Sequence, residues 1–251
     1  MLNIVIPMAG RGSRFAKEGY IDPKPLIKLK NKRMIEVVIN NLKPSTPHRF
    51  IFVCQRQHVE EYQLEKFLKS WAPGCEIVCI DGITEGAACT VMCAKEFIDN
   101  EDPLMIANSD QWIDIDINDY LAYMDDNDLD GLIMTMKADD PKWSYAELDN
   151  NGLVKKVVEK VVVSDEATVG IYNYKKGADF CKNVLTMIKN EERTNGEFYV
   201  APVYTLMVNN DKAKIGIYNI GEEANGMYGL GIPSDLELFL SLDVSSRALD
   251  F

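Results

Sequence analysis

The chain has 251 residues, of which 47% are apolar and 26% are charged. This composition is typical of a soluble globular protein and excludes low-complexity, collagen-like and disulfide-scaffold chains. The 39 acidic and 27 basic residues give a net charge of −12, which opposes attraction to nucleic acids and to anionic membranes. We therefore expect no nucleic-acid or membrane partner, and the sequence leaves assembly into a homo-oligomer open.

Residues 1–7 are apolar but have no basic segment before them, and the run ends at Gly10. Such a run is too short for a signal sequence or a membrane span, so we expect a cytoplasmic protein. The cysteine pairs at 75/79 and 89/93 have the spacing C-x3-C, which is not a zinc pattern. We expect these residues to be buried free thiols.

The first half of the chain alternates short β-rich runs with helical ones. Strands are predicted at 2–7, 50–54, 76–80, 104–108 and 131–136, and helices at 34–42, 59–71, 86–97 and 117–124. In the 59–71 helix, positions 59, 62, 67, 68 and 71 form a predicted core stripe. This alternation indicates an α/β sheet with parallel strands.

The second half is richer in predicted strands. They fall at 145–148, 153–158, 167–174 and 214–218, with helices at 178–189, 200–208 and 234–242. Neither a linker nor an internal repeat is evident. We expect one α/β domain over 1–251 with a mixed, mostly parallel central sheet flanked by helices. Its two lobes would divide at about 136/137.

Charge is distributed unevenly along the chain. Residues 11–33 contain eight Lys or Arg and two acidic residues, whereas the segment between Lys95 and Lys137 contains twelve carboxylates and no basic residue. A basic loop in an acidic protein suits a small anionic ligand, and a carboxylate-rich segment suits a divalent cation. A solvated acidic surface also accounts for most of these carboxylates.

The loop after the first predicted strand is the best candidate for ligand binding, because ligands of open α/β sheets lie beyond the carboxyl ends of the strands. It reads M-A-G-R-G-S-R-F at 8–15, and its two glycines allow close approach of an anion to the backbone. Neither the Walker A nor the dinucleotide-binding pattern is present. In D-P-K-P-L at 22–26, two prolines are expected to hold Lys24 in an extended backbone, with Arg14 available to the same loop.

Residues 10–36, with G-R-G-S-R followed by P-K-P, resemble the signature of the nucleotidyltransferase family that activates sugar 1-phosphates and other small phosphorylated compounds. The resemblance implies a Rossmann-like domain of the GT-A type. It also implies that the loop wraps a nucleoside triphosphate whose charge Arg14 and Lys24 neutralise. The implied nucleotide-binding residues here are Met8, Ala9, Gly10, Arg11, Gly12, Ser13, Arg14 and Lys24.

Further motifs of that family follow along the chain. T-E-G-A-A-C-T at 84–90 resembles the loop that meets the nucleobase, and A-N-S-D at 107–110 resembles the strand end whose aspartate holds Mg²⁺. E-K at 159–160, V-G-I-Y at 169–172 and N-G-E-F-Y at 195–199 are similar to segments around the acceptor, and G-I-P-S-D-L at 231–236 resembles a late motif. The resemblance thus implies base contacts from Glu85, Gly86, Ala87 and Ala88, a metal at Asp110, and acceptor contacts from Glu159, Lys160, Gly170, Tyr172, Asn195 and Glu197.

One position departs from the family. Gly229 stands where the family usually has a second metal-binding aspartate. Three readings stay open: Asp110 holds Mg²⁺ largely with nucleotide phosphates and waters, another carboxylate such as Glu197 substitutes for the missing aspartate, or activity has been lost.

The reaction implied is Mg²⁺-dependent transfer of a nucleoside monophosphate to the phosphate of a small acceptor, with release of pyrophosphate, catalysed by Arg14, Lys24 and Asp110. Glu85 could accept a hydrogen bond from the exocyclic amine of cytosine, which favours CTP. The chain most resembles the cytidylyltransferase branch that uses phosphoglutamine in bacterial capsular phosphoramidate synthesis.

Other readings remain for both the acceptor and the activity. A sugar 1-phosphate or phosphocholine acceptor fits the same motifs. Asp114 and Asp116 spell D-x-D, which allows a glycosyltransferase that uses nucleotide sugars. The substitution at Gly229 allows a non-catalytic nucleotide-binding module.

Overall fold

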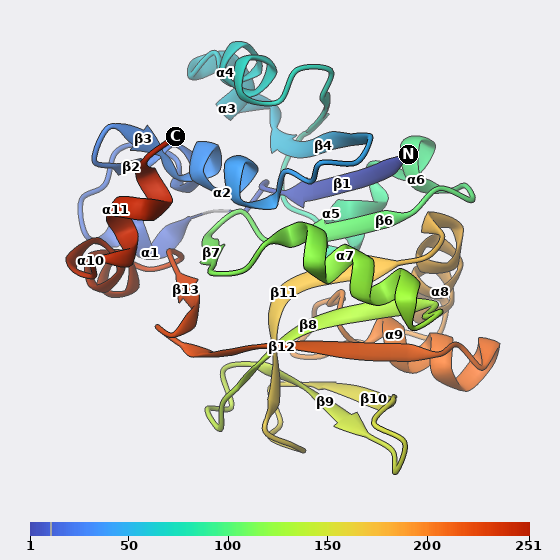
Figure 1. Cartoon of the computed structure of the whole chain (residues 1–251). Helices are drawn as coiled ribbons and strands as arrows, with labels where there is room; N and C mark the ends of the chain where they lie inside the picture. The colour runs from blue at the N-terminus through green and yellow to red at the C-terminus, as the bar shows by residue number, and fades with distance from the viewer. Residues whose placement is uncertain (11) are drawn as a thin grey trace.

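The computed structural model describes residues 1–10 and 12–251, and a sheet of 11 strands forms its centre (Figure 1). The strands are β1 (Leu2–Pro7), β4 (His48–Gln55), β5 (Glu76–Ile80), β6 (Leu104–Ala107), β7 (Gln111–Ile113), β8 (Gly131–Lys137), β9 (Ser144–Leu148), β10 (Val154–Glu159), β11 (Glu166–Tyr174), β12 (Ile215–Glu223) and β13 (Gly226–Gly229). A separate small hairpin consists of β2 (Lys28–Leu29) and β3 (Lys32–Arg33).

The main path of the sheet has the order β5-β4-β1-β6-β11-β8-β12-β13-β7. Seven of these nine strands run in one direction, because β11 and β7 alone are antiparallel to their neighbours on this path. The chain reaches β11 from β8 through the antiparallel hairpin of β9 and β10, so β11 returns alongside β8. The predicted mixed, mostly parallel α/β sheet is confirmed.

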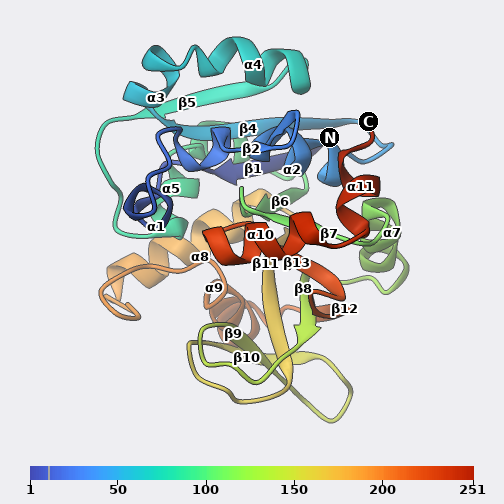
Figure 2. The same cartoon turned by 90° about the vertical axis from the view of Figure 1, so that its left-hand side faces the viewer.

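Helices cover both faces of the sheet. They are α1 (Ser13–Lys17), α2 (Met34–Leu42), α3 (Arg56–Glu61), α4 (Leu64–Trp71), α5 (Ala87–Met92), α6 (Lys95–Ile98), α7 (Ile117–Asp126), α8 (Gly177–Lys189), α9 (Val203–Leu206), α10 (Pro233–Ser241) and α11 (Val244–Leu249), with a 3₁₀ turn η1 (Lys24–Leu26) and a π-helical turn η2 (Met207–Asp211). One buried core joins α2, α4 and α7 to the sheet, and another joins α5, α6, α8 and α9 to it. Figures 1 and 2 show α3 and α4 at one end of the molecule and the β9–β10 hairpin at the other.

Two predicted helices are interrupted in the structure. The helix expected at 59–71 is two helices, α3 and α4, and Gln63 between them has a φ of 51°. The predicted core stripe is therefore wrong in part: Leu64 and Leu68 are buried, whereas Phe67 is 39% exposed. The helix expected at 86–97 divides likewise into α5 and α6.

The cysteines are free thiols, as expected, but they are not all buried. Cys54, Cys75 and Cys181 are buried, whereas Cys93 is exposed on the turn that follows α5. The short helix turns its other face, with Ala88 and Val91, to the core. In residues 1–10 and 12–251, no helix is both long enough and apolar enough to cross a membrane.

A third core fixes the C-terminal segment beside the N-terminal loop. Phe15 from α1, Trp112 from β7, Tyr228 from β13 and Phe239 from α10 are all buried in it. The ring of Phe239 lies 6.0 Å from that of Trp112 and 5.8 Å from that of Tyr228. This core therefore determines where residues 229–235 lie relative to the loop after β1.

Replacing Phe239 with alanine should remove contacts in this core, and we expect it to lower the free energy of unfolding by about 3–5 kcal/mol. Leu238, its neighbour on α10, is 50% exposed, and Leu238→Ala is the matched control, with an expected loss below about 1 kcal/mol. Urea denaturation of both variants measures the two losses. Similar losses would show that the third core is not a rigid part of the fold.

Candidate functional site

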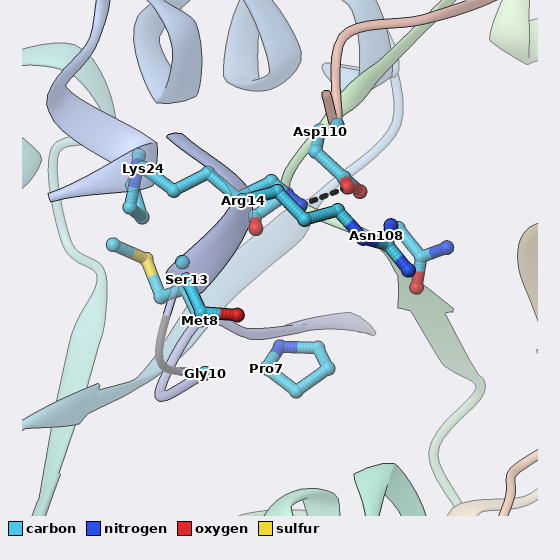
Figure 3. Close-up of a pocket in the computed structure, with 12 residues that line it drawn as sticks. Pro7, Met8, Gly10, Ser13, Arg14, Lys24, Asn108 and Asp110 are labelled. Carbon is cyan, nitrogen blue, oxygen red and sulfur yellow. Dashed lines mark hydrogen bonds and ion pairs between the residues drawn. The ribbon is translucent and has the colours of Figure 1, made fainter. Parts of the chain in front are cut away.

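A cavity of about 380 Å³ lies at the carboxyl ends of β1 and β6 (Figure 3). We call it the loop cavity, because the loop after β1 forms one wall and the end of β6 forms the opposite one. Its lining residues are Pro7, Met8, Gly10, Gly12, Ser13, Arg14, Lys24, Pro25, Asn108, Ser109, Asp110 and Gly231. Residues from three distant parts of the sequence therefore converge here.

Gly12 allows the loop to turn tightly against Lys24. Its φ is 59°, in the left-handed region that glycine adopts without strain, and a Cβ atom there would lie 3.2 Å from Cβ of Lys24. Among the described residues, no atom beyond its chain neighbours lies within 4 Å of such a position at Gly10, so this face of Gly10 is open to the cavity. The two glycines predicted to allow close approach of an anion thus serve different purposes: one packs against Lys24, and the other leaves open space.

Lys24 crosses the cavity and pairs with the carboxylate of Asp110 (Figure 3). The two side chains are 24% and 23% exposed, so the ion pair is largely shielded from water. Pro23 is extended, but Lys24 begins the 3₁₀ turn η1, and the extended backbone predicted for Lys24 is wrong. A proline at the second position of a turn already has the φ that the turn requires, which makes the Lys24–Pro25 turn favourable.

Gly231 lies against this ion pair. A Cβ atom at Gly231 would overlap Oδ2 of Asp110 and would lie 3.3 Å from Nζ of Lys24. The backbone is held there because the Leu230 amide donates to the carbonyl oxygen of Asp110 at 2.8 Å. Only a glycine permits this approach without displacing Asp110 or Lys24.

A second cavity, of about 500 Å³, shares Arg14, Asn108, Asp110 and Gly231 with the loop cavity, and we call it the middle cavity. Asp235 lines it together with Gly229. Oδ2 of Asp235 lies 3.1 Å from the place that a Cβ of residue 229 would take. Partial burial and the nearby Glu223 raise the pKa of Asp235, whereas the charges of Lys142 and Arg14 lower it.

Asp110 and Asp235 are thus two carboxylates on one cavity, one at each end of the segment 229–231. In the part of the chain that the structure describes, no three His, Cys, Asp or Glu side chains form a group that could hold a metal ion. Asp110 nevertheless suits a cation, because the ammonium group of Lys24 already lies on its carboxylate. Carboxylate donors supplemented by phosphates and water are the usual ligands of Mg²⁺.

A third cavity, of about 250 Å³, is formed by the β9–β10 hairpin, β11 and the segment 199–201, and we call it the hairpin cavity. Its lining residues are Ala87, Asn108, Lys142, Trp143, Ser144, Glu159, Thr168, Val169, Gly170, Tyr172, Tyr199, Val200 and Ala201. Asn108 belongs to all three cavities, and its side chain packs where a Cβ of Gly170 would lie. The loop cavity and the hairpin cavity therefore meet at the end of β6.

Lys160 follows β10 with a φ of 58° and is exposed. Its Nζ donates to the phenol oxygen of Tyr199 at 3.0 Å, which raises the pKa of Lys160. Tyr199 lines the hairpin cavity, so Lys160 lies behind a wall residue and is not itself among the lining residues. Asn195 and Glu197 are exposed on the neighbouring turn. Among the described residues that line the three cavities, neither of them is present.

The loop predicted to meet the base is held by the segment before Val200. The Phe198 amide donates to the carbonyl oxygen of Glu85 at 2.8 Å, and a Cβ at Gly86 would overlap the backbone of Phe198. The Glu85 carboxylate is 2.7 Å from the Arg193 guanidinium, an ion pair on the surface. Glu85 is thus engaged by a cation.

Gly10 also borders a cavity of about 460 Å³ beyond β4 and β5. Gln55 lines it, and its Nε2 donates to the carbonyl oxygens of Ala9 and Gly82 at 2.6 and 2.7 Å. Gln55, the last residue of β4, thereby connects the loop after β1 to the loop after β5. Sequence reasoning missed Gln55, for which its position at the end of a predicted strand was the only signal.

The predicted residues divide into four groups. Among the described residues, one group lines neither the loop cavity nor the hairpin cavity: Ala9, Glu85, Gly86, Ala88, Lys160, Asn195 and Glu197. Met8, Gly10, Gly12, Ser13, Arg14, Lys24 and Asp110 line the loop cavity, and Ala87, Glu159, Gly170 and Tyr172 line the hairpin cavity. Arg11 lies outside the described residues. Sequence reasoning assigned no role to Asn108, Lys142, Trp143 or Asp235, although Asn108 and Asp235 fall within the quoted motifs.

The D-x-D pair has structural partners. Asp114 pairs with Arg247 at 2.8 Å, and Asp116 accepts from the Asn118 amide at the start of α7. Among the described residues, neither carboxylate lines one of the three cavities. This placement gives no support to a metal-binding D-x-D site.

Known proteins share this architecture. The nucleoside-diphosphate-sugar pyrophosphorylase of Vibrio cholerae RC9 superposes with a TM-score of 0.79 and 23% identity, covering 95% of this chain and 100% of that one. UDP-glucose pyrophosphorylase of Acinetobacter baumanii has a TM-score of 0.71 and 16% identity, covering 96% and 92%. At these identities the likeness is one of fold.

The mannose-1-phosphate guanylyltransferase catalytic subunit beta of Dictyostelium discoideum is 27% identical over 178 residues. The match covers 68% of this chain and 49% of that protein, so the chain spans about half the length of this curated relative. The model of the family described as nucleotidyl transferase matches residues 4–214. That match extends over most of the chain and includes the loop after β1, Asp110 and the β9–β10 hairpin, so the chain belongs to the nucleotidyl transferase family.

Proposed function

We propose that the chain transfers a nucleoside monophosphate from a nucleoside triphosphate to the phosphate of a small acceptor and releases pyrophosphate. The observation that supports this proposal best is the loop cavity, in which an open glycine backbone, two basic side chains and one carboxylate face one another. We further propose CTP as the donor and phosphoglutamine as the acceptor. A sugar 1-phosphate and phosphocholine are the alternative acceptors.

Arg14 and Lys24 would offset the charge of the triphosphate and of the departing pyrophosphate. Both basic residues come from short segments that the third core and the Gly12 turn hold in place, so their backbone positions are set before the ligand binds. A fixed backbone limits the reorganisation to the side chains, and cations placed near the phosphates stabilise the transition state. The acceptor phosphate is already deprotonated and can attack the α-phosphorus without a general base.

Asp110 would hold Mg²⁺, and the middle cavity offers Asp235 as a second carboxylate in place of an aspartate at position 229. Among the described residues, Asp235 lines the middle cavity beside Gly229, whereas Glu197 lines none of the three cavities. Asp235 is therefore a better candidate than Glu197 for the second carboxylate. A bound Mg²⁺ would neutralise phosphate oxygens and orient them. Lys24, displaced from Asp110 by that ion, would be free to bind a phosphate.

The acceptor would occupy the hairpin cavity, with its phosphate directed toward Asn108, where the two cavities meet. Lys160 would attract this phosphate from behind Tyr199. In this assignment, residues 1–136 supply most of the nucleotide site and residues 137–251 most of the acceptor site. The segment 229–235 is the exception, since it borders the nucleotide side.

The reaction is tested by mixing the protein with Mg²⁺, each of the four nucleoside triphosphates and a panel of phosphoglutamine, phosphocholine and sugar 1-phosphates. Pyrophosphate release is the readout. We expect release only when triphosphate and acceptor are both present, with CTP and phosphoglutamine as the fastest pair. Nucleotide binding without release for any pair would instead indicate a non-catalytic nucleotide-binding module.

Lys24→Ala should lower the rate of pyrophosphate release by about 100- to 1000-fold, because it removes a positioned cation from the triphosphate site. Lys28→Ala is the matched control: Lys28 is exposed on β2, and the same charge is lost outside the loop cavity. Steady-state kinetics at saturating acceptor compare the two variants. Equal rates in both would mean that Lys24 only stabilises the turn at η1.

A further inference from the structure

Glu159 is a buried carboxylate that the family resemblance assigns to the acceptor, and the transfer chemistry above does not say which acceptor group it would bind. It is 9% exposed and lines the hairpin cavity. It stands opposite Ser144 in the antiparallel β9–β10 ladder, and the Ser144 hydroxyl donates to its Oε2. Within residues 1–10 and 12–251, no basic side chain forms an ion pair with it.

A buried charge without a countercharge is unfavourable unless a ligand supplies the partner. Burial raises the pKa of Glu159, while the Ser144 hydroxyl and the charge of Lys160 act in the opposite direction. The Lys160 ammonium group is turned to Tyr199 instead. The carboxylate therefore lines the cavity with one side-chain hydrogen bond and, among the described residues, without an ion-pair partner.

The walls of the hairpin cavity are suited to a cation. Trp143, Tyr172 and Tyr199 all line it, and the faces of aromatic rings attract positive charge. Two of these rings already attract an ammonium group of the chain, because Nζ of Lys142 lies 4.9 Å from the centre of the Trp143 ring and Nζ of Lys160 lies 5.2 Å from that of Tyr199. The basic group in the lining, Lys142, is engaged by Glu223 at 2.9 Å and by Asp140 at 3.8 Å, so its repulsion of a ligand cation is reduced. A carboxylate that shares a cavity with aromatic rings favours ammonium groups over neutral ones.

Lys160 and Glu159 also place opposite charges at adjacent positions of the chain. The Lys160 amide donates to the Trp143 carbonyl oxygen at 3.1 Å, which fixes the end of the hairpin. A ligand in this cavity would meet a cation beyond Tyr199 and an anion at Glu159. A molecule with a phosphate at one end and an ammonium group at the other matches both.

We propose that Glu159 binds a positively charged nitrogen of the acceptor, so that the substrate class is phosphorylated compounds carrying an ammonium group rather than phosphorylated neutral sugars. This inference rests on the proposed function, because it assigns the hairpin cavity to the acceptor. Phosphorylated amino acids and amino alcohols both belong to the class. The cavity of about 250 Å³ limits the acceptor to a small molecule.

The test compares ligands that differ only in charge. Phosphoethanolamine is paired with propyl phosphate, and phosphocholine with 3,3-dimethylbutyl phosphate, in which carbon replaces the charged nitrogen. Calorimetric titrations are made in Mg²⁺ and α,β-methylene CTP, which prevents turnover. We expect at least one ammonium compound to bind about 10- to 100-fold more tightly than its neutral partner.

Glu159→Gln should abolish that preference, since it keeps an acceptor for the Ser144 hydroxyl and loses the charge. Glu147→Gln is the matched control, because Glu147 is on the same hairpin and pairs there with Lys155 and Lys156, and it should keep the preference. A wild-type protein that binds each ammonium compound and its neutral partner equally overturns the inference. This outcome does not depend on the stability of either variant.

Failure of the inference and failure of the proposed function give different results. Pyrophosphate release with glucose 1-phosphate, together with equal binding in both ligand pairs, would leave the transfer reaction standing and would make Glu159 a partner of sugar hydroxyls. A preserved ammonium preference without pyrophosphate release for any triphosphate would contradict the transfer reaction and leave the ligand assignment of Glu159 supported.

Discussion

The ion pair between Lys24 and Asp110 joins the segment after β1 to the end of β6, and the candidate site is built around it. Gly12 and Gly231 approach its two members so closely that a side chain at either position would press on the pair. Without a ligand, the pair also neutralises a cation and an anion that would otherwise be partly buried and uncompensated. A triphosphate with its metal ion can replace this internal compensation, because it brings both charges with it.

The third core positions one side of the candidate site. Residues from α1, β7, β13 and α10 pack together, and this packing brings Gly229, Gly231 and Asp235 beside a loop more than 200 positions earlier in the sequence. Asp235 fills the space that a side chain at position 229 would need. The departure at Gly229 is therefore matched by a carboxylate from the next helix, so a carboxylate remains on this side of the cavity.

The sequence predicted best the helices and strands whose formation depends on residues close together in the chain. The strands 2–7 and 76–80 and the helix 34–42 have the predicted bounds, because their apolar periodicity and flanking turns lie within a few residues of one another. The sequence also predicted that the loop at 8–15 and Asp110 follow strands, and the structure has them after β1 and β6. Three features could not be predicted, because each depends on contacts between distant segments. Gly10 is open to the loop cavity, Glu85 pairs with Arg193, and Asp235 lies beside Gly229. Trp143 gave no signal, as it lies outside every motif.

We propose that the Lys24–Asp110 pair marks the place where the triphosphate and its metal ion bind. A crystal structure with Mg²⁺ and α,β-methylene CTP tests it most directly. We expect the phosphates to lie in the loop cavity, Asp110 to contact Mg²⁺, and Nζ of Lys24 to have moved from Asp110 to a phosphate oxygen. An unchanged Lys24–Asp110 pair with the nucleotide bound elsewhere would contradict it.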